Sequence, residues 1–191
     1  MTAYLDEYNP NSQYANFRVQ SDPRKLSYNN IQSCIAVALW PSQNRELVGV
    51  HLTTAITNNE ELKRVTAELN QKKGRAQCDA YLVGAYSANK YDTETRLKRQ
   101  LKQIVRTVWV CDVPKVGGID GRNKAANIDV KIELVNGLPK AYVRFHAEFK
   151  TDASGARIPV PKPQGDWPPG QPRNELDKDG KPWMAVDFKR G

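Results

Sequence analysis

Two short β-like stretches in the first half of the chain predict an early β-hairpin. Residues 31–40 are almost continuously apolar, which is typical of a short buried strand. Residues 45–54 are also β-like, and within them Leu47, Gly49, His51 and Thr53 share one face. The polar cluster at 41–44 lies between the two stretches and predicts the connecting turn.

Two later segments carry apolar side chains at helical spacing, which predicts helices over 58–73 and 92–107. Gly74 is expected to end the first helix, and Asp92 is expected to cap the start of the second. Residues 78–86 are apolar on both faces and therefore predict a central strand, followed by a short strand at 109–113. The residues of the two helical stripes are Leu62, Val65, Leu69, Leu97, Leu101, Ile104 and Val108.

A second hairpin is the clearest local pattern in the sequence. Apolar and polar residues alternate over 128–134 and again over 141–149. Asn136 and Gly137 stand between these stretches, and Asn-Gly is the strongest short hairpin signal. One face of this hairpin is expected to pack on the core and the other, which carries His146, to face water.

Together these elements predict an α+β fold, with layered helices and strands: a β-sandwich-like core flanked by two helices. The composition changes after Lys150, because seven of the twelve prolines lie between Pro159 and Pro182. We therefore expect a domain over 1–150 and a Pro/Gly-rich extended tail over 151–191, packed on the domain or flexibly attached. Residues 183–188 are expected to form a last short strand.

Charge and cysteine content narrow the functional classes. The 191 residues carry a net charge of +8, and residues 61–107 alone carry a net charge of +6. Lys98, Lys102 and Arg106 recur at four-residue spacing, which fits either a solvated helix face or a surface for nucleic acid or an acidic protein partner. Three cysteines without a CxxC motif argue against a disulfide scaffold or a zinc site. The sequence shows neither a membrane-spanning run nor a signal-type apolar segment.

The candidate chemistry lies in the first hairpin, where Cys34 and His51 are 17 positions apart. If the loop spans 41–44, Cys34 lies directly opposite His51, with Cβ atoms roughly 4.5–5.5 Å apart. An adjacent imidazole can take the thiol proton and hold the resulting thiolate as an ion pair. Buried cysteines more often serve packing, and Cys78 and Cys111 are expected to be core residues. Tyr28, Asn29 or Asn30 is expected to orient the imidazole.

The residues around this pair resemble a known family. The segment Asn30 to Val37 contains Ser33-Cys34, and Gly49-Val50-His51 follows. This pattern is similar to the nucleophile segment of the CheD chemotaxis-receptor glutamine deamidases, which share a fold and a Cys–His site with cytotoxic necrotizing factor toxins. The resemblance covers residues 25–113. It departs from the family at Gln32, where a glycine is expected, and at Tyr28, where the family has an orienting threonine.

The resemblance implies a cysteine-dependent glutamine deamidase with a protein substrate, without a cofactor or metal. Cys34 is the expected nucleophile, His51 the general base and acid, and Tyr28 an orienting residue through its backbone carbonyl. Such a chain is expected to be a monomer without membrane contact, cytoplasmic or delivered as a bacterial effector or toxin without a cleavable signal. Two other functions stay open: a non-catalytic basic module that binds nucleic acid or an acidic partner, and a cysteine peptidase or acyltransferase with the same dyad.

Overall fold

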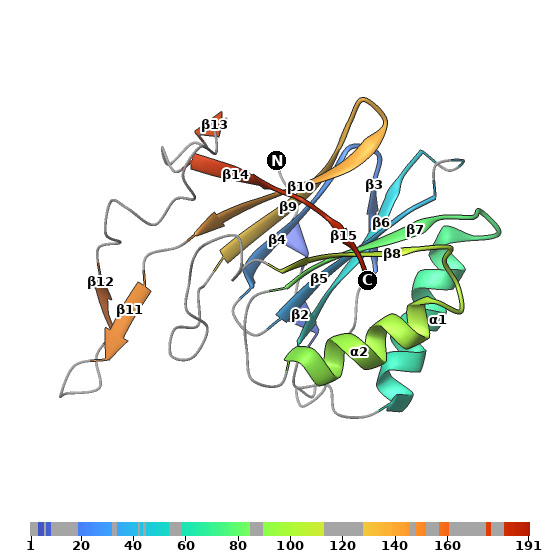
Figure 1. Cartoon of the computed structure of the whole chain (residues 1–191), viewed down its shortest axis with the longest axis horizontal. Helices are drawn as coiled ribbons and strands as arrows, with labels where there is room; N and C mark the ends of the chain where they lie inside the picture. The colour runs from blue at the N-terminus through green and yellow to red at the C-terminus, as the bar shows by residue number, and fades with distance from the viewer. Residues whose placement is uncertain are drawn as a thin grey trace.

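The described residues form strands and two helices in layers (Figure 1). The computed structural model describes residues 4–5, 7–8, 19–31, 34–41, 43, 45–53, 59–84, 90–112, 128–145, 148–151, 157–160, 175–176 and 182–191. The elements are β1 (Tyr4–Leu5), β2 (Glu7–Tyr8), β3 (Gln20–Asp22), β4 (Lys25–Ile31), β5 (Cys34–Trp40), β6 (Leu47–Thr53), α1 (Asn59–Lys73), β7 (Asp79–Gly84), α2 (Lys90–Leu101), β8 (Val108–Asp112), β9 (Ile128–Val135), β10 (Leu138–Phe145), β11 (Glu148–Thr151), β12 (Arg157–Val160), β13 (Glu175–Leu176), β14 (Pro182–Val186) and β15 (Lys189–Arg190).

One sheet carries the first hairpin and orders its strands β15-β8-β7-β5-β6-β2, with β3 also pairing with β6. The central strand β5 is buried along almost its whole length, which explains why its sequence is apolar on both faces. One of these faces packs on the helices, through Ile35, Val37 and Leu39. The other face, with Cys34, Ala36 and Ala38, packs on the second sheet. The predicted central position of the strand around 78–86 is confirmed, because β7 lies between β5 and β8.

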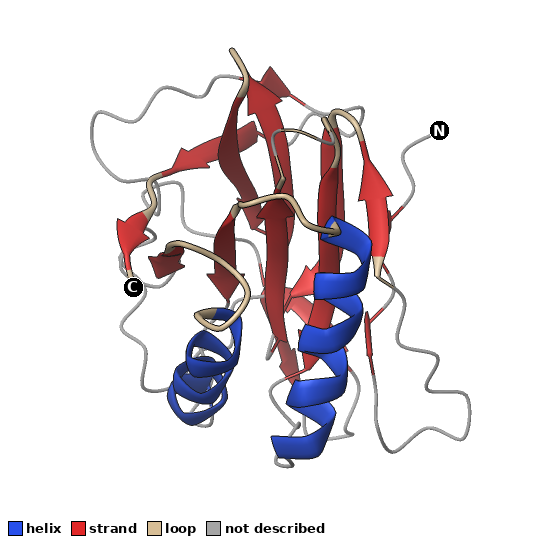
Figure 2. Cartoon of the chain, turned by 90° about the vertical axis from the view of Figure 1, so that its right-hand side faces the viewer, coloured by secondary structure: helices blue, strands red, loops and turns tan. Residues whose placement is uncertain are grey.

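The helices α1 and α2 lie against the same face of this sheet (Figure 2). The first helix ends where expected, because Gly74 adopts a φ of 64°, a conformation that glycine reaches without strain. The second helix was predicted too long at its C-terminal end: it runs from Lys90 to Leu101, so Asp92 lies within it. Val108, placed on its apolar stripe by the sequence, belongs to β8. Among the described helices, none is long and apolar enough to cross a membrane.

The second sheet orders its strands β1-β4-β9-β10-β14-β13. The hairpin of β9 and β10 confirms the Asn-Gly turn, since Asn136 and Gly137 have φ values of 53° and 78°. The second strand of the hairpin ends at Phe145 instead of continuing to Phe149, which belongs to β11. His146 lies outside the described residues.

The outer face of this hairpin is less exposed to water than its polar residues predict. The carboxylate of Asp129 and the guanidinium of Arg144 are directly opposed and form a buried ion pair. The Arg144 guanidinium also lies 5.0 Å from the centre of the Trp183 ring on β14. Each charge thus has a partner, which is the condition for burying it at tolerable cost.

The end of the proline-rich segment belongs to both sheets. The strand expected near 183–188 is present as β14, which pairs with β10, and Val186 is part of the core between the sheets. The last strand, β15, pairs with β8 in the other sheet. The described C-terminal residues are therefore part of the fold and not an appendage to it.

Tyr28 of β4, in the second sheet, contacts β5 and β6 of the first sheet. The Tyr28 hydroxyl donates a hydrogen bond of 2.7 Å to the carbonyl oxygen of Val37. Gly49 makes this possible: a Cβ atom there would lie against the Tyr28 hydroxyl and only 2.6 Å from the Val37 carbonyl oxygen. A glycine inside a strand often marks such a close approach of another segment.

We expect Gly49→Ala to destabilise the protein by about 1–3 kcal/mol, because the added methyl group overpacks this contact. The hydroxyl and the methyl group compete for the same space. The double variant Gly49→Ala/Tyr28→Phe should therefore lose less free energy of unfolding than the sum of the two single variants. Urea unfolding of the four proteins measures this coupling.

Gly74→Ala provides the matched control, because a Cβ atom at Gly74 meets no other atom within 4 Å. Its effect should add to that of Tyr28→Phe within a few tenths of a kcal/mol. If the effect of Gly49→Ala added to that of Tyr28→Phe as fully as the effect of Gly74→Ala does, the packing of the Tyr28 hydroxyl against Gly49 would be contradicted.

Candidate functional site

The candidate site lies at the end of the first hairpin, opposite its turn. Cys34 is the first residue of β5, and its backbone partner Thr53 is the last residue of β6. The neighbouring strands β7 and β8 end at the same level, where Gly84 pairs with both Ile35 and Asp112. Strand ends that meet in this way place side chains at the boundary between a rigid sheet and its loops, where catalytic groups are often found.

The register that the sequence predicted for this hairpin is wrong by two residues. His51 pairs with Ala36, and not with Cys34. The connection between the strands is longer than the four residues expected, because Arg45 adopts a left-handed backbone conformation with a φ of 55°. Arg45 and Glu46 consequently lie exposed outside the strand.

A shift of two residues preserves the face on which a side chain lies. Cys34 and His51 therefore remain on the interior face, as diagonal neighbours on adjacent strands. Diagonal neighbours lie about 7–8 Å apart, with shorter Cβ separations, within reach of a long side chain such as histidine. Both residues are buried, each 2% exposed. The arrangement thus brings the thiol and the imidazole to one region beneath the second sheet.

Tyr28 reaches the site from the second sheet. Its ring lies edge-on to the imidazole of His51, with ring centroids 6.4 Å apart and an interplanar angle of 80°. The contact that the structure shows is made by the ring, whereas the sequence assigned the orienting role to the backbone carbonyl. The carbonyl's role stays a prediction, and the ring provides a second way to hold the imidazole in place.

The three cysteines differ in their surroundings, although all are buried and none forms a disulfide. Cys78 lies in the core between the sheet and the helices, and burial raises the pKa of its thiol to about 11. Cys111 lies in the same core as Cys34, two strands away from β5. Of the three, Cys34 is the one on the strand that pairs with the histidine-bearing strand.

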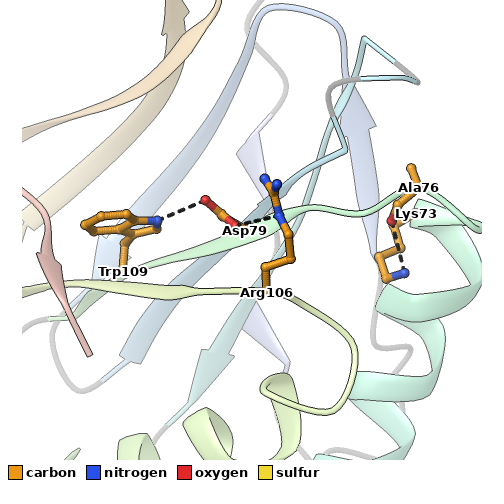
Figure 3. Close-up of polar contacts among 5 residues, drawn as sticks. All are labelled: Lys73, Ala76, Asp79, Arg106 and Trp109. Atoms are coloured by element: carbon orange, nitrogen blue, oxygen red, sulfur yellow. Dashed lines mark hydrogen bonds and ion pairs between the residues drawn. The ribbon is translucent and has the colours of Figure 1, made fainter.

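The basic residues singled out in the sequence do not form one helix face. The helix ends at Leu101, so Lys102 and Arg106 lie beyond it. Lys98 is paired with Glu94 at 3.5 Å. Figure 3 shows Arg106 beside Asp79, at 3.4 Å, on the carboxylate that also accepts a hydrogen bond of 3.2 Å from the indole of Trp109. Two of the three cations therefore have a carboxylate next to them within the chain.

Within the part of the chain that the structure describes, no group of three or more His, Cys, Asp or Glu side chains is arranged to hold a metal ion.

Comparison of the chain with protein-family models and with curated protein sequences finds no match.

The sequence alone did not identify two features of the site: the close packing against Gly49 and the contact of the Tyr28 ring with His51. A glycine within an otherwise apolar strand was a usable signal for the first. The second had no such signal, because Tyr28 belongs to a different sheet and reaches His51 only through the packing of the two sheets.

Because Tyr28 is buried, the free energy of unfolding is expected to depend on pH in the alkaline range. Its pKa is raised well above the ordinary value of 10.0, because the ionised phenolate would lose its hydration. The stability contributed by the neutral hydroxyl is complete below pH 10.0 and is lost as pH rises through the folded-state pKa.

Tyr28→Phe should cost about 1 kcal/mol at neutral pH, since one buried hydrogen bond is lost. The difference between the variant and the wild type should shrink as the pH is raised from about 8 to about 11. Urea unfolding at a series of pH values measures it, and a difference that stays constant with pH would contradict the buried, neutral hydroxyl.

Proposed function

We propose that this chain is a cysteine-dependent protein glutamine deamidase, with Cys34 as nucleophile and His51 as general base and acid. The observation that carries the proposal is the shared interior face of these two residues on adjacent strands at one end of the hairpin. The resemblance of Ser33-Cys34 and Gly49-Val50-His51 to the CheD segment supports the same assignment. The layers of helices and strands are compatible with it.

The reaction follows from the chemistry of the two groups. The imidazole takes the proton of the Cys34 thiol, and the thiolate attacks the side-chain carbonyl carbon of a glutamine. The tetrahedral intermediate carries an oxyanion, for which we assign backbone N–H groups near Cys34 as donors. The carbon–nitrogen bond then breaks, and the imidazolium protonates the departing ammonia.

The resulting thioester is resolved by water. His51 removes a proton from the water molecule, which attacks the thioester carbon. The carbon–sulfur bond breaks, and the thiolate of Cys34 is released. The net change is hydrolysis of an amide to a carboxylate and ammonium, with the Tyr28 ring proposed to keep the imidazole directed toward the thiol.

The burial of both groups adds a requirement to this proposal. With Cys34 and His51 each 2% exposed, a protein side chain reaches them only after part of the molecule moves. Active-site segments that open in this way are common in enzymes. The peptidase and acyltransferase alternatives use the same dyad. A peptidase would cleave a backbone amide, and an acyltransferase would transfer the acyl group of the thioester to an acceptor other than water.

The basic binding module has less support. Lys98 and Arg106 lie next to Glu94 and Asp79, which reduces the positive potential that a polyanion would meet. We also propose an acidic partner at the surface of Lys98, Lys102 and Arg106, and a location in the cytoplasm or, after secretion, in a host cell.

The direct test is deamidation of candidate protein substrates, followed by peptide mass spectrometry. Wild-type protein should produce the small mass increase of one amide-to-acid exchange at a single glutamine. Cys34→Ser should lose this activity almost completely, because a hydroxyl is a far weaker acid than a thiol. His51→Ala should reduce the rate about 100-fold or more, the usual contribution of a general base.

Cys78→Ala is the matched control, because it removes a thiol from the helix side of the same sheet. It should retain the activity of the wild type. Peptide-bond cleavage in place of the mass shift would replace the deamidase with a peptidase. Undiminished activity in Cys34→Ala would exclude the dyad.

A further inference from the structure

The N-terminal segment crosses from one sheet to the other beside the candidate site. Within β1, Leu5 pairs with Tyr28 on the edge of the second sheet. Within β2, Glu7 pairs with His51 on the edge of the first sheet. The same short stretch of chain therefore contacts the backbones of the two residues whose rings meet in the site.

The two N-terminal strands make only short pairings. The strands β1 and β2 contain two residues each, and both pair in parallel. Strands in globular proteins usually have three to ten residues, and parallel pairing is slightly less stable per residue. The outer edge of β6 is shared, because β3 occupies Leu47–Gly49 while β2 occupies His51–Leu52. On this edge of the sheet, β2 pairs with His51 and β3 does not. Loss of β2 would therefore uncover the backbone of His51 even while β3 stays paired.

We propose that the edge of β6 at His51 and Leu52 is a binding site for an extended segment of the protein substrate, and that Glu7–Tyr8 occupies this site until the segment displaces it. The proposal rests on the proposed function and specifies how the substrate is held. Strand addition to a sheet edge is a common mode of peptide recognition, in which backbone hydrogen bonds provide affinity.

The register determines on which face of the sheet a bound substrate side chain lies. Directly paired residues of neighbouring strands share a face of the sheet. A substrate residue in the position of Glu7 thus lies on the interior face with His51, the face that also carries Cys34. A glutamine presented in an extended segment enters the site along the face on which the dyad lies, while a folded loop could not form the same backbone pairing.

The first experiment uses a substitution to release Glu7–Tyr8 from the edge of β6. Glu7→Pro removes a backbone N–H group and disrupts the strand, whereas Glu7→Ala leaves the backbone intact. The rate of alkylation of each cysteine by iodoacetamide under native conditions is followed by mass spectrometry. Glu7→Pro should accelerate modification of Cys34 about tenfold or more, since local opening controls access to it. Cys78 should be unaffected, and Glu7→Ala should behave like the wild type.

The second experiment supplies the strand from outside. A synthetic peptide with the sequence of residues 1–12 is added to the Glu7→Pro protein and should slow alkylation of Cys34 back toward the wild-type rate. The same peptide with proline in place of Glu7 should have no effect. Equal acceleration of all three cysteines, or no protection by the peptide, would overturn the proposal.

Hydrogen exchange of the wild-type protein gives a result that does not depend on how the variant folds. The amides of Leu5, Glu7 and Tyr8 should exchange well before those of β5 and β6. Exchange at the same rate would mean that the segment leaves only on global unfolding, which contradicts displacement by a substrate. None of these measurements requires deamidation: if they succeed and no substrate is deamidated, the strand site stands and the proposed reaction fails.

Discussion

The hydrogen bond from the Tyr28 hydroxyl to the Val37 carbonyl oxygen joins the two sheets at the place where the candidate site is built. Both of its atoms lie close to Gly49 of β6, and no larger residue fits there without displacing Tyr28, Leu26 or the backbone of β5. The small side chains of Ala36 and Ala38 line the same interior face. This close approach brings a ring of the second sheet against His51 of the first. The geometry of the imidazole thus depends on the packing of the sandwich and not on the hairpin alone.

Each strand of the hairpin contributes to two different parts of the protein. On one face, Val37 and Val50 pack with the helices and stabilise the fold. On the other face, Cys34 and His51 take part in the core between the sheets. A substitution on the helix face should therefore act through stability, whereas one on the interior face acts on the site as well. Because the site is buried, the proposed reaction requires a neighbouring segment to open, and the short strand β2 pairs directly with His51 through Glu7.

The sequence predicted those parts of the fold that local physics controls. Apolar periodicity located α1 and both hairpins, and the Asn136-Gly137 turn followed from its backbone preferences. The register of the first hairpin was missed because loop length was inferred from polar residues, while Arg45 adopts a positive φ that composition does not reveal. The face shared by Cys34 and His51 was nevertheless correct, since an even shift preserves it. The role of the Tyr28 ring and the pairing of residues 4–8 depend on contacts between distant segments, which no local pattern encodes.

In the proposed reaction, His51 controls the ionisation of the Cys34 thiol. The most direct measurement is the pH dependence of Cys34 alkylation, compared between the wild type and His51→Ala. Within one protein, opening of the site multiplies the alkylation rate of Cys34 by the same factor at every pH. Burial of the site therefore does not change the shape of the plot of alkylation rate against pH. If His51 has this role, the wild-type alkylation rate should change little from about pH 8 down to about pH 6, because the thiolate persists as an ion pair. In His51→Ala the rate should fall about tenfold for each pH unit, as for an ordinary thiol. The same steep fall of the alkylation rate in both proteins would contradict control of the Cys34 thiol by His51.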